Sequence, residues 1–227
     1  MDTKHEERQH VAYSIRVATP DDAASIVAIY APYVQHTTVT CECVVPTVDA
    51  YRSRIASITD RYPFLVACDH DESVIGYAYA GPFKPRSAYD WSVETTVYVS
   101  SDCQGRGVAR GLYDALERVL VEQHITNENA CIIASNAQSI AFHEHRGFHQ
   151  VALFSKCAYK LGEWLDMVWM EKTIAPHVEQ PQPILDFPLW YAAFQQRKSA
   201  HDASDAADAH SASMTCTSAD AHSISAN

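Results

Sequence analysis

The stretch from Trp91 to Tyr113, WSVETTVYVSSDCQGRGVARGLY, constrains the fold of this chain more than any other. A β-branched run, Val93 to Val99, contains a single acidic residue, Glu94, and ends in the polar turn SSDCQ. Gly-Arg-Gly and an amphipathic helical pattern follow at once. A strand, a glycine-rich turn and a helix start direct free backbone N–H groups and the positive end of a helix dipole at an anion. Because a strand carboxylate is costly to bury, the stretch predicts a site for a phosphorylated cofactor beside a proton-accepting residue.

Composition narrows the class of protein. The 227 residues allow one domain with tails or two small domains, and 47% of them are hydrophobic, which is enough for a sizeable core. A formal charge of −11 argues against a general surface for nucleic acid or an anionic membrane. The seven cysteines form no regular framework, and no apolar run approaches the roughly 18 residues of a membrane span. We therefore expect a soluble, cytoplasmic protein with reduced thiols and no nucleic-acid or membrane partner.

Hydrophobic periodicity predicts strands and helices that alternate only in part. The expected strands are 15–18, 64–68, 73–81, 93–99, 131–135, 148–156 and 165–173. The expected helices run from Thr19-Pro20 to Pro32, from Thr47 to about Tyr62, from about Val108 to Gln123, and from Asn136 to His145. This partial alternation favours a mixed α/β or α+β sheet over a doubly wound one.

The composition also predicts the domain boundaries. We expect a flexible N-terminus over 1–12, one domain over 13–174, and a linker with a low-complexity, disordered tail over 175–227. The apolar segment 184–194 stands out in that tail. It either docks as a short helix onto the domain or a partner, or has no function.

The turn carries a family resemblance. Gln104, Gly107 and Ala109 match the Gln/Arg-x-x-Gly-x-Gly/Ala loop of the GNAT N-acetyltransferase superfamily, which the chain resembles over about 14–174. The segments RYPFLVA, GYAYAGPFKPRSAYDWSVETTVYV and FHEHRGF resemble its branch of phosphinothricin, methionine sulfoximine and methionine sulfone acetyltransferases. The resemblance implies a central, twisted, mostly antiparallel sheet flanked by helices, and acetyl-CoA as co-substrate.

The same resemblance implies a cofactor site, and the residues agree with it. Main-chain N–H groups of the turn can donate to phosphate oxygens, and two arginines add charge there. The strand backbone can bind the pantetheine arm, and Asn136 can act as a helix N-cap, as a cofactor contact, or as both. The predicted cofactor-binding residues are Val97, Tyr98, Val99, Gln104, Gly105, Arg106, Gly107, Val108, Ala109, Arg110 and Asn136.

Two residues are predicted to be catalytic. Acetyl transfer needs a neutral amine, and a carboxylate beside an alkylammonium of pKa about 10.4 can take its proton. Glu94 matches the Glu of the branch's V-E-x-x-V-Y-V motif, which has that role. His143 lies where many GNAT enzymes have a Tyr that protonates the leaving thiolate. It can act as that acid, as a second base, or only structurally.

The acceptor site is predicted from Lys84, Arg86, Tyr89 and Cys41. Two cations and a phenol can hold an α-carboxylate and a phosphinate or sulfone oxygen. Cys41 stands where the phosphinothricin enzymes have an aromatic residue, which changes the shape of the expected pocket. Cys41-x-Cys43 is too closely spaced for a zinc site, so no metal is expected.

We therefore expect an enzyme that acetylates the amine of a small amino-acid-like substrate by direct attack in a ternary complex. Two alternatives stay open, a non-catalytic acyl-CoA-binding module and a peptide or protein N-acetyltransferase. The resemblance also leaves a homodimer open, with the final strands as its interface.

Overall fold

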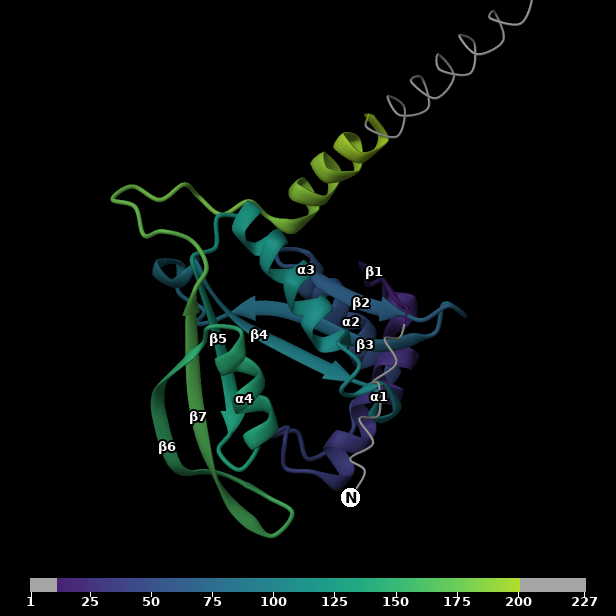
Figure 1. Cartoon of the computed structure of the whole chain (residues 1–227), viewed down its shortest axis with the longest axis vertical. Helices are drawn as coiled ribbons and strands as arrows, with labels where there is room; N and C mark the ends of the chain where they lie inside the picture. The colour runs from purple at the N-terminus through teal and green to yellow at the C-terminus, as the bar shows by residue number, and fades with distance from the viewer. Residues whose placement is uncertain (1–11, 201–227) are drawn as a thin grey trace, which may run out of the picture. The chain divides into compact units, whose positions relative to one another are not determined.

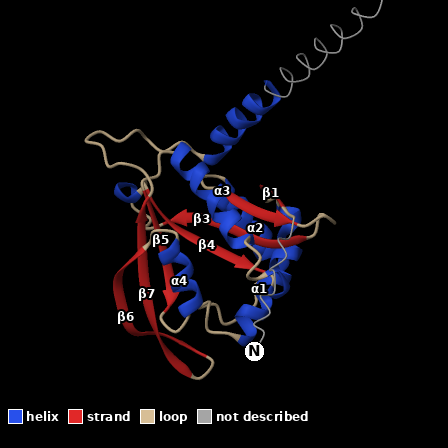
Figure 2. Ribbon diagram, in the orientation of Figure 1, coloured by secondary structure: helices blue, strands red, loops and turns tan. Residues whose placement is uncertain are grey.

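The computed structural model of the chain describes residues 12–200, and their strands form a single seven-stranded sheet (Figures 1 and 2). The strand order is β1-β2-β3-β4-β5-β7-β6, and each described pair is antiparallel except β4 with β5. The strands are β1 Ser14–Val17, β2 Phe64–Cys68, β3 Val74–Pro82, β4 Ser92–Val99, β5 Asn127–Ile133, β6 His149–Lys160 and β7 Glu163–Thr173. The helices are α1 Ala23–His36, α2 Val48–Thr59, α3 Val108–Glu122 and α4 Ala137–His145. The predicted α+β class is confirmed.

Helices cover both faces of the sheet. Phe64, Val66 and Cys68 of β2 pack with α1 and α2, whereas Leu65 and Ala67 pack with α3 on the other face. All five are buried, since a strand between two helical layers has no face left for water. α4 lies on the same face as α3, where its apolar side chains pack with those of β5 and β7.

Helix α1 continues through Pro32, where the sequence predicted its end. It runs to His36 with Pro32 inside it. Proline removes one helical hydrogen bond, but the last turn buries Val34 to 1% exposure and packs Tyr33 against the tyrosines of the sheet. Tertiary packing therefore outweighs the local preference to stop.

The strands after α3 also differ from the prediction. β5 spans Asn127–Ile133 rather than 131–135, because Glu128 and Asn129 are buried in it although both are polar. β6 runs to Lys160, four residues beyond the predicted end, and pairs with β7 across a short turn. Apolar pattern alone cannot predict strand segments made of polar residues.

The compact unit that contains the sheet extends to Phe187, past the boundary predicted at 174. Residues 182–187, here called the strap, account for this. Leu185 N–H donates to Gln123 O at 3.1 Å, and Phe187 N–H donates to Arg61 O at 3.1 Å. The segment thus adds to the domain by backbone hydrogen bonds, which composition does not reveal.

A helix over 187–200 follows, where the sequence suggested a short helix within 184–194. It belongs to a second compact unit that begins at Pro188. Within it the rings of Trp190 and Phe194, one helical turn apart, stack with centroids 5.1 Å apart. The predicted flexible N-terminus and low-complexity tail fall on 1–11 and 201–227, outside the described residues.

Candidate active site

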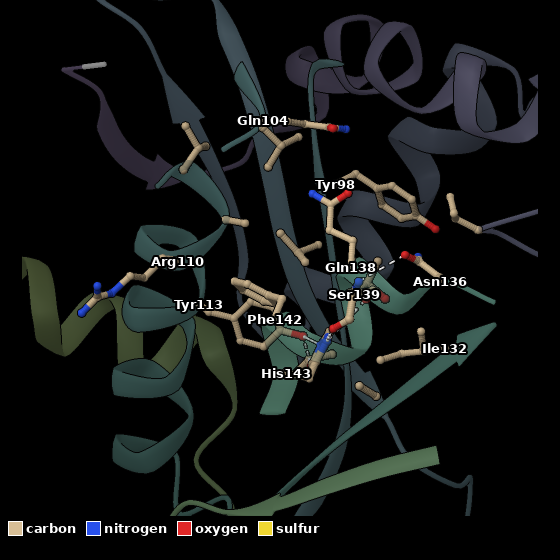
Figure 3. A pocket seen from close by; sticks show the side chains of 18 of the residues that line it. Tyr98, Gln104, Arg110, Tyr113, Ile132, Asn136, Gln138, Ser139, Phe142 and His143 are labelled. Atoms are coloured by element: carbon tan, nitrogen blue, oxygen red, sulfur yellow. Dashed lines mark hydrogen bonds between the residues drawn. The ribbon is translucent and has the colours of Figure 1, made fainter. Parts of the chain in front are cut away.

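A cavity opens where two parallel strands separate. β4 pairs with β5 only from Ser92 to Glu94, opposite Asn127 to Asn129, and Figure 1 shows the two strands running apart from there. The cavity has a volume of about 410 Å³ and is lined by β4 from Glu94 onward, the glycine turn with the start of α3, residues 130–132 of β5, and α4 (Figure 3). Backbone groups of both strands therefore face a space instead of each other.

Side chains fix the point of separation. Thr95 Oγ1 donates to Asn129 O at 3.3 Å, and Asn129 Nδ2 donates to Val93 O at 3.1 Å. All three residues are buried. These two bonds cross between the strands just where the regular pairing ends, so they hold the mouth of the cavity at a set width.

The glycine turn forms one end of the cavity. Gly105 and Gly107 have φ of 71° and 85°, a left-handed conformation that glycine adopts without strain, and Gly107 is the N-cap of α3. A Cβ at Gly105 would meet no atom within 4 Å, so the turn faces open space. The first N–H groups of α3 have no helical acceptor. This donor set suits the phosphates of acetyl-CoA.

Strand β4 presents alternating faces to its surroundings. Val97 packs with the core on the α3 side, while the ring of Tyr98 lies against those of Tyr30 and Tyr33, with centroids 4.9 and 5.1 Å apart. Tyr33 was not predicted. Its hydroxyl donates to Val99 O at 2.6 Å and accepts from Gln104 Nε2 at 2.7 Å. α1 thereby joins the end of β4 to the glycine turn.

Glu94 is half-buried at the point where β4 and β5 separate. Burial raises its pKa above the usual value, and the positive charge of Lys84 offsets part of this rise. A carboxylate with a raised pKa is a better proton acceptor near neutral pH than an ordinary one.

His143 is 3% exposed, and both of its ring nitrogens have partners. Nδ1 lies 2.7 Å from Ser139 O, which can only accept, so Nδ1 carries the hydrogen. Burial lowers the pKa of His143, so the neutral ring has Nε2 free to accept from the Tyr113 hydroxyl, 2.9 Å away. That hydroxyl also lies 2.9 Å from Thr95 Oγ1. Figure 3 shows Tyr113 and His143 meeting at the wall of the cavity.

Asn136 combines the two roles that the sequence left open to it in part. It is the N-cap of α4, and its Oδ1 accepts from Ser139 N–H at 3.1 Å. It also lines the cavity. The N-cap role is therefore observed, and the cofactor contact stays a prediction.

The glycine turn, the separated strands and the buried glutamate match a known family. An acetyltransferase (GNAT) domain model matches residues 15–169. The chain belongs to the GNAT acetyltransferase family. It is an acetyl-CoA-dependent N-acetyltransferase, as the sequence predicted.

Several relatives of this GNAT chain have names. It is 36% identical over 168 residues to a phosphinothricin N-acetyltransferase of Alcaligenes faecalis, covering 72% of this chain and 83% of the relative. It is 33% identical to an L-methionine sulfoximine/L-methionine sulfone acetyltransferase of Pseudomonas paraeruginosa, covering 74% and 98%. The structure of a phosphinothricin acetyltransferase from Sinorhizobium meliloti in complex with AcCoA is similar, with TM-score 0.73 and 30% identity over 78% and 98% of the chains. A ribosomal-protein-alanine N-acetyltransferase from Brucella melitensis has TM-score 0.68 and 32% identity over 70% and 99%.

The GNAT cavity brings together most of the predicted site. Its lining includes each predicted catalytic and cofactor-binding residue except Arg106, which is exposed on the turn: Glu94, Val97, Tyr98, Val99, Gln104, Gly105, Gly107, Val108, Ala109, Arg110, Asn136 and His143. The roles of these residues remain predictions.

The four predicted acceptor residues do not line the cavity. Lys84 Nζ lies 4.7 Å from the Phe83 ring centroid and 5.2 Å from that of Trp169, close enough for its charge to act on Glu94. Cys41 Sγ lies 4.0 Å from Met167 Sδ.

The other two are exposed. Arg86 precedes the 3-10 turn Ser87–Tyr89, and Tyr89 is 40% exposed. The structure therefore brings Lys84 toward Glu94 and leaves Arg86 and Tyr89 at the surface.

Sequence reasoning missed Tyr113, Thr95 and Cys131, which also line the cavity. Burial raises the pKa of the Cys131 thiol to about 12. Tyr113 had a usable signal, because it lies on the apolar face of α3 and a buried tyrosine hydroxyl needs a hydrogen-bond partner. The other two carried no signal in one sequence.

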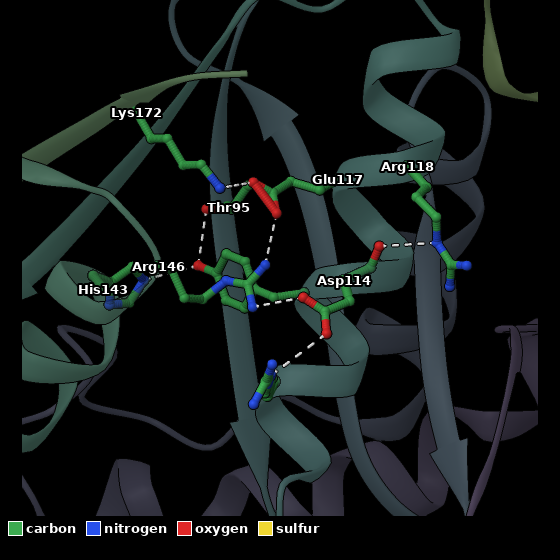
Figure 4. A network of polar contacts seen from close by, with 9 residues as sticks. Thr95, Asp114, Glu117, Arg118, His143, Arg146 and Lys172 are labelled. Carbon is green, nitrogen blue, oxygen red and sulfur yellow. Dashed lines mark hydrogen bonds and ion pairs between the residues drawn. The ribbon is translucent and has the colours of Figure 1, made fainter. Parts of the chain in front are cut away.

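A network of charges lies behind Tyr113 (Figure 4). Arg146 pairs with Asp114 at 2.8 Å and with Glu117 at 2.6 Å, and Lys172 also pairs with Glu117. The Arg146 guanidinium lies over the Tyr113 ring, 5.0 Å from its centroid. These contacts hold α3, α4 and β7 together on the side of Tyr113 away from the cavity.

Within residues 12–200, no three His, Cys, Asp or Glu side chains are grouped so that they could hold a metal ion. Over the same residues, no helix combines the length and apolarity needed to cross a membrane.

Proposed function

We propose that this GNAT enzyme moves an acetyl group from acetyl-CoA to the amine of a small amino-acid-like substrate, of the phosphinothricin, methionine sulfoximine or methionine sulfone type. The names of the relatives support this class of acceptor. One observation carries the mechanism: Glu94, with its raised pKa, lies in the same cavity as the glycine turn.

Glu94 acts as the general base. Acetyl-CoA supplies the acetyl group as a thioester, and the amine attacks it directly within a ternary complex. The Glu94 carboxylate takes the ammonium proton, directly or through one water molecule. Main-chain N–H groups in the 97–99 part of β4 stabilise the developing oxyanion. The turn from Gly105 to Arg110 holds the pyrophosphate.

His143 acts through Tyr113. Its only N–H donates to Ser139 O, so the ring has no N–H left to give to a leaving thiolate. Nε2 instead accepts from Tyr113 and fixes the direction of that hydroxyl. We therefore assign the acid role to Tyr113 and a positioning role to His143, among the three roles left open for the histidine.

The test is release of CoA thiol from acetyl-CoA in the presence of phosphinothricin, methionine sulfoximine or methionine sulfone. Glu94→Gln should lower kcat at least about 100-fold, the lower part of the range for general base catalysis. Glu171→Gln is the matched control, a strand glutamate on β7 at the sheet surface, and should keep wild-type activity.

Activity in wild type that survives Glu94→Gln would overturn the base assignment. Acetyl-CoA binding without thiol release across a broad panel of amines would favour a non-catalytic acyl-CoA-binding module.

A peptide or protein acceptor is the second candidate, supported by the name of the Brucella melitensis relative. The same assay with peptides that begin with alanine separates the two. The cation Lys84 beside Glu94 favours a small acidic acceptor.

Two further proposals complete the picture. We propose a cytoplasmic enzyme, since its thiols are free in the described residues. We also propose that it can form a homodimer through β6 and β7, whose exposed apolar residues include Phe154 and Trp164. Sedimentation equilibrium measures the second directly.

A further inference from the structure

The strap, residues 182–187, lies outside the region that matches the family, which ends at residue 169. It nevertheless belongs to the compact unit of the sheet. Ile184 packs against the core on the α3 side, and Phe187 is 3% exposed. The strap is thus a built part of this domain that the family assignment does not explain.

One set of contacts anchors the strap to the ends of α2 and α3. Gln123 is 1% exposed, and its Nε2 donates to Leu185 O at 2.7 Å and to Arg61 O at 2.9 Å. Backbone bonds from Leu185 N–H to Gln123 O and from Phe187 N–H to Arg61 O complete this attachment. A buried amide with two acceptors makes it specific, since leaving the amide unpaired would be costly.

A second set of contacts joins the strap to residues 83–91, here called the acceptor loop. Trp91 Nε1 donates to Gln182 O at 2.7 Å. Arg61 lies between the loop and the strap, 3.1 Å from Asp90 and 3.7 Å from Asp186. The strap therefore holds the loop at its C-terminal end, three residues before Glu94.

The other end of the acceptor loop is held by the sheet. Phe83 N–H donates to Ser92 O at 3.4 Å, and its ring lies 5.5 Å from that of Trp169. Lys84 is next to Phe83 and acts on Glu94 through its charge. The separation of Lys84 from Glu94 thus depends on a loop that is fixed at both ends, at one of them by the strap.

We propose that the strap is a positioning element for the acceptor loop, and that this C-terminal extension thereby sets the affinity for the acidic acceptor. The proposal rests on the proposed function, in which Lys84 helps to bind the acceptor. The strap touches neither the glycine turn nor α4 in any contact described above, so acetyl-CoA binding does not depend on it.

The test uses full-length variants. Phe187→Ala weakens the buried end of the strap, and Trp91→Phe removes the indole donor to Gln182 while keeping an aromatic ring. The matched control is Leu189→Ala, an apolar truncation two residues further on at a position that is 64% exposed.

Phe187→Ala and Trp91→Phe should each raise the KM for the acceptor about three- to tenfold, the range for losing one or two hydrogen bonds. The KM for acetyl-CoA should change less than about twofold. The double variant should show little more than the larger single effect, because both changes break one contact. The acid limb of the rate profile should shift to higher pH, since Lys84 moves away and no longer lowers the pKa of Glu94.

An unchanged acceptor KM in Trp91→Phe would overturn the proposal, even if Phe187→Ala fails to fold. Hydrogen exchange gives a reading that needs no activity: the amides of Tyr89 and Asp90 should exchange faster in both variants than in Leu189→Ala, with α3 amides unchanged. If wild type acetylates no amine, this exchange result still decides the role of the strap. Equal exchange in all three variants would refute it.

Discussion

Tyr113 places a single hydroxyl among three polar groups inside an apolar core. The residue is fully buried, and burial raises its pKa far above that of a free tyrosine. The hydroxyl therefore stays protonated over the working pH range and can act as a donor. Its direction is set because His143 Nε2 accepts from it.

Tyr113→Phe tests this assignment. We expect kcat to fall about tenfold or more, because the proton donor is lost, while both KM values change little. Tyr77→Phe is the matched control, since Tyr77 is equally buried and its hydroxyl also has a partner, Tyr51 at 3.0 Å. Both variants should lose about 1 kcal/mol of stability. Steady-state kinetics that show full kcat in Tyr113→Phe would leave His143 with a structural role.

At the scale of elements, the glycine turn before α3 carries the acetyl-CoA prediction. Gly107→Ala forces a Cβ into a left-handed conformation and should cost about 1–2 kcal/mol. It should also raise the KM for acetyl-CoA, because the turn must relax and its N–H groups lose their alignment.

Gly147→Ala separates the two effects. Gly147 has φ of 88°, so the same substitution carries the same strain, but it lies outside the cavity. We expect a similar loss of thermal stability with an unchanged KM for acetyl-CoA. Equal KM values in both variants would show that the turn does not bind the cofactor.

The strand, turn and helix from Trp91 to Tyr113 could be predicted because local chemistry determines each of them. Glycine sets the turn, β-branched residues set the strand, and the apolar period sets the helix. Pro32 shows the opposite case, where packing of Val34 overrides a local signal.

Tertiary position explains the other misses in the site. Glu128 and Asn129 read as polar loop, yet they form a buried strand. The distance of Arg86 from the cavity follows from the path of a loop, which no local pattern specifies.

At the scale of the whole molecule, two buried acids act on stability in opposite directions. Burial alone would raise the pKa of Asp22, but hydrogen bonds from Arg16 at 2.7 and 2.8 Å outweigh it and lower this pKa. That contribution is present above the unfolded pKa and is lost as the pH falls. Burial raises the pKa of Glu128 to about 8, so its contribution is present at low pH and is lost as the pH rises toward 8. Stability should therefore be highest on the acid side of neutrality.

Glu128→Gln should remove the loss at high pH. A shift from 4.5 to about 8 corresponds to at most about 5 kcal/mol, at about 1.4 kcal/mol per unit. Urea unfolding at pH 9 should show a clear gain over wild type, and the gain should shrink at pH 5. Glu163→Gln, at an exposed position on β7, should show neither effect. A gain of the same size at both pH values would mean that charge is not its cause.

The strap has a consequence for where this domain ends. A boundary drawn from kinship falls at residue 169, and one drawn from hydrogen bonds falls at Phe187. A fragment cut at the first boundary would leave the Gln123 amide and the Trp91 indole without the carbonyls they now reach. Ancestry and physical completeness thus divide the same polypeptide at different places.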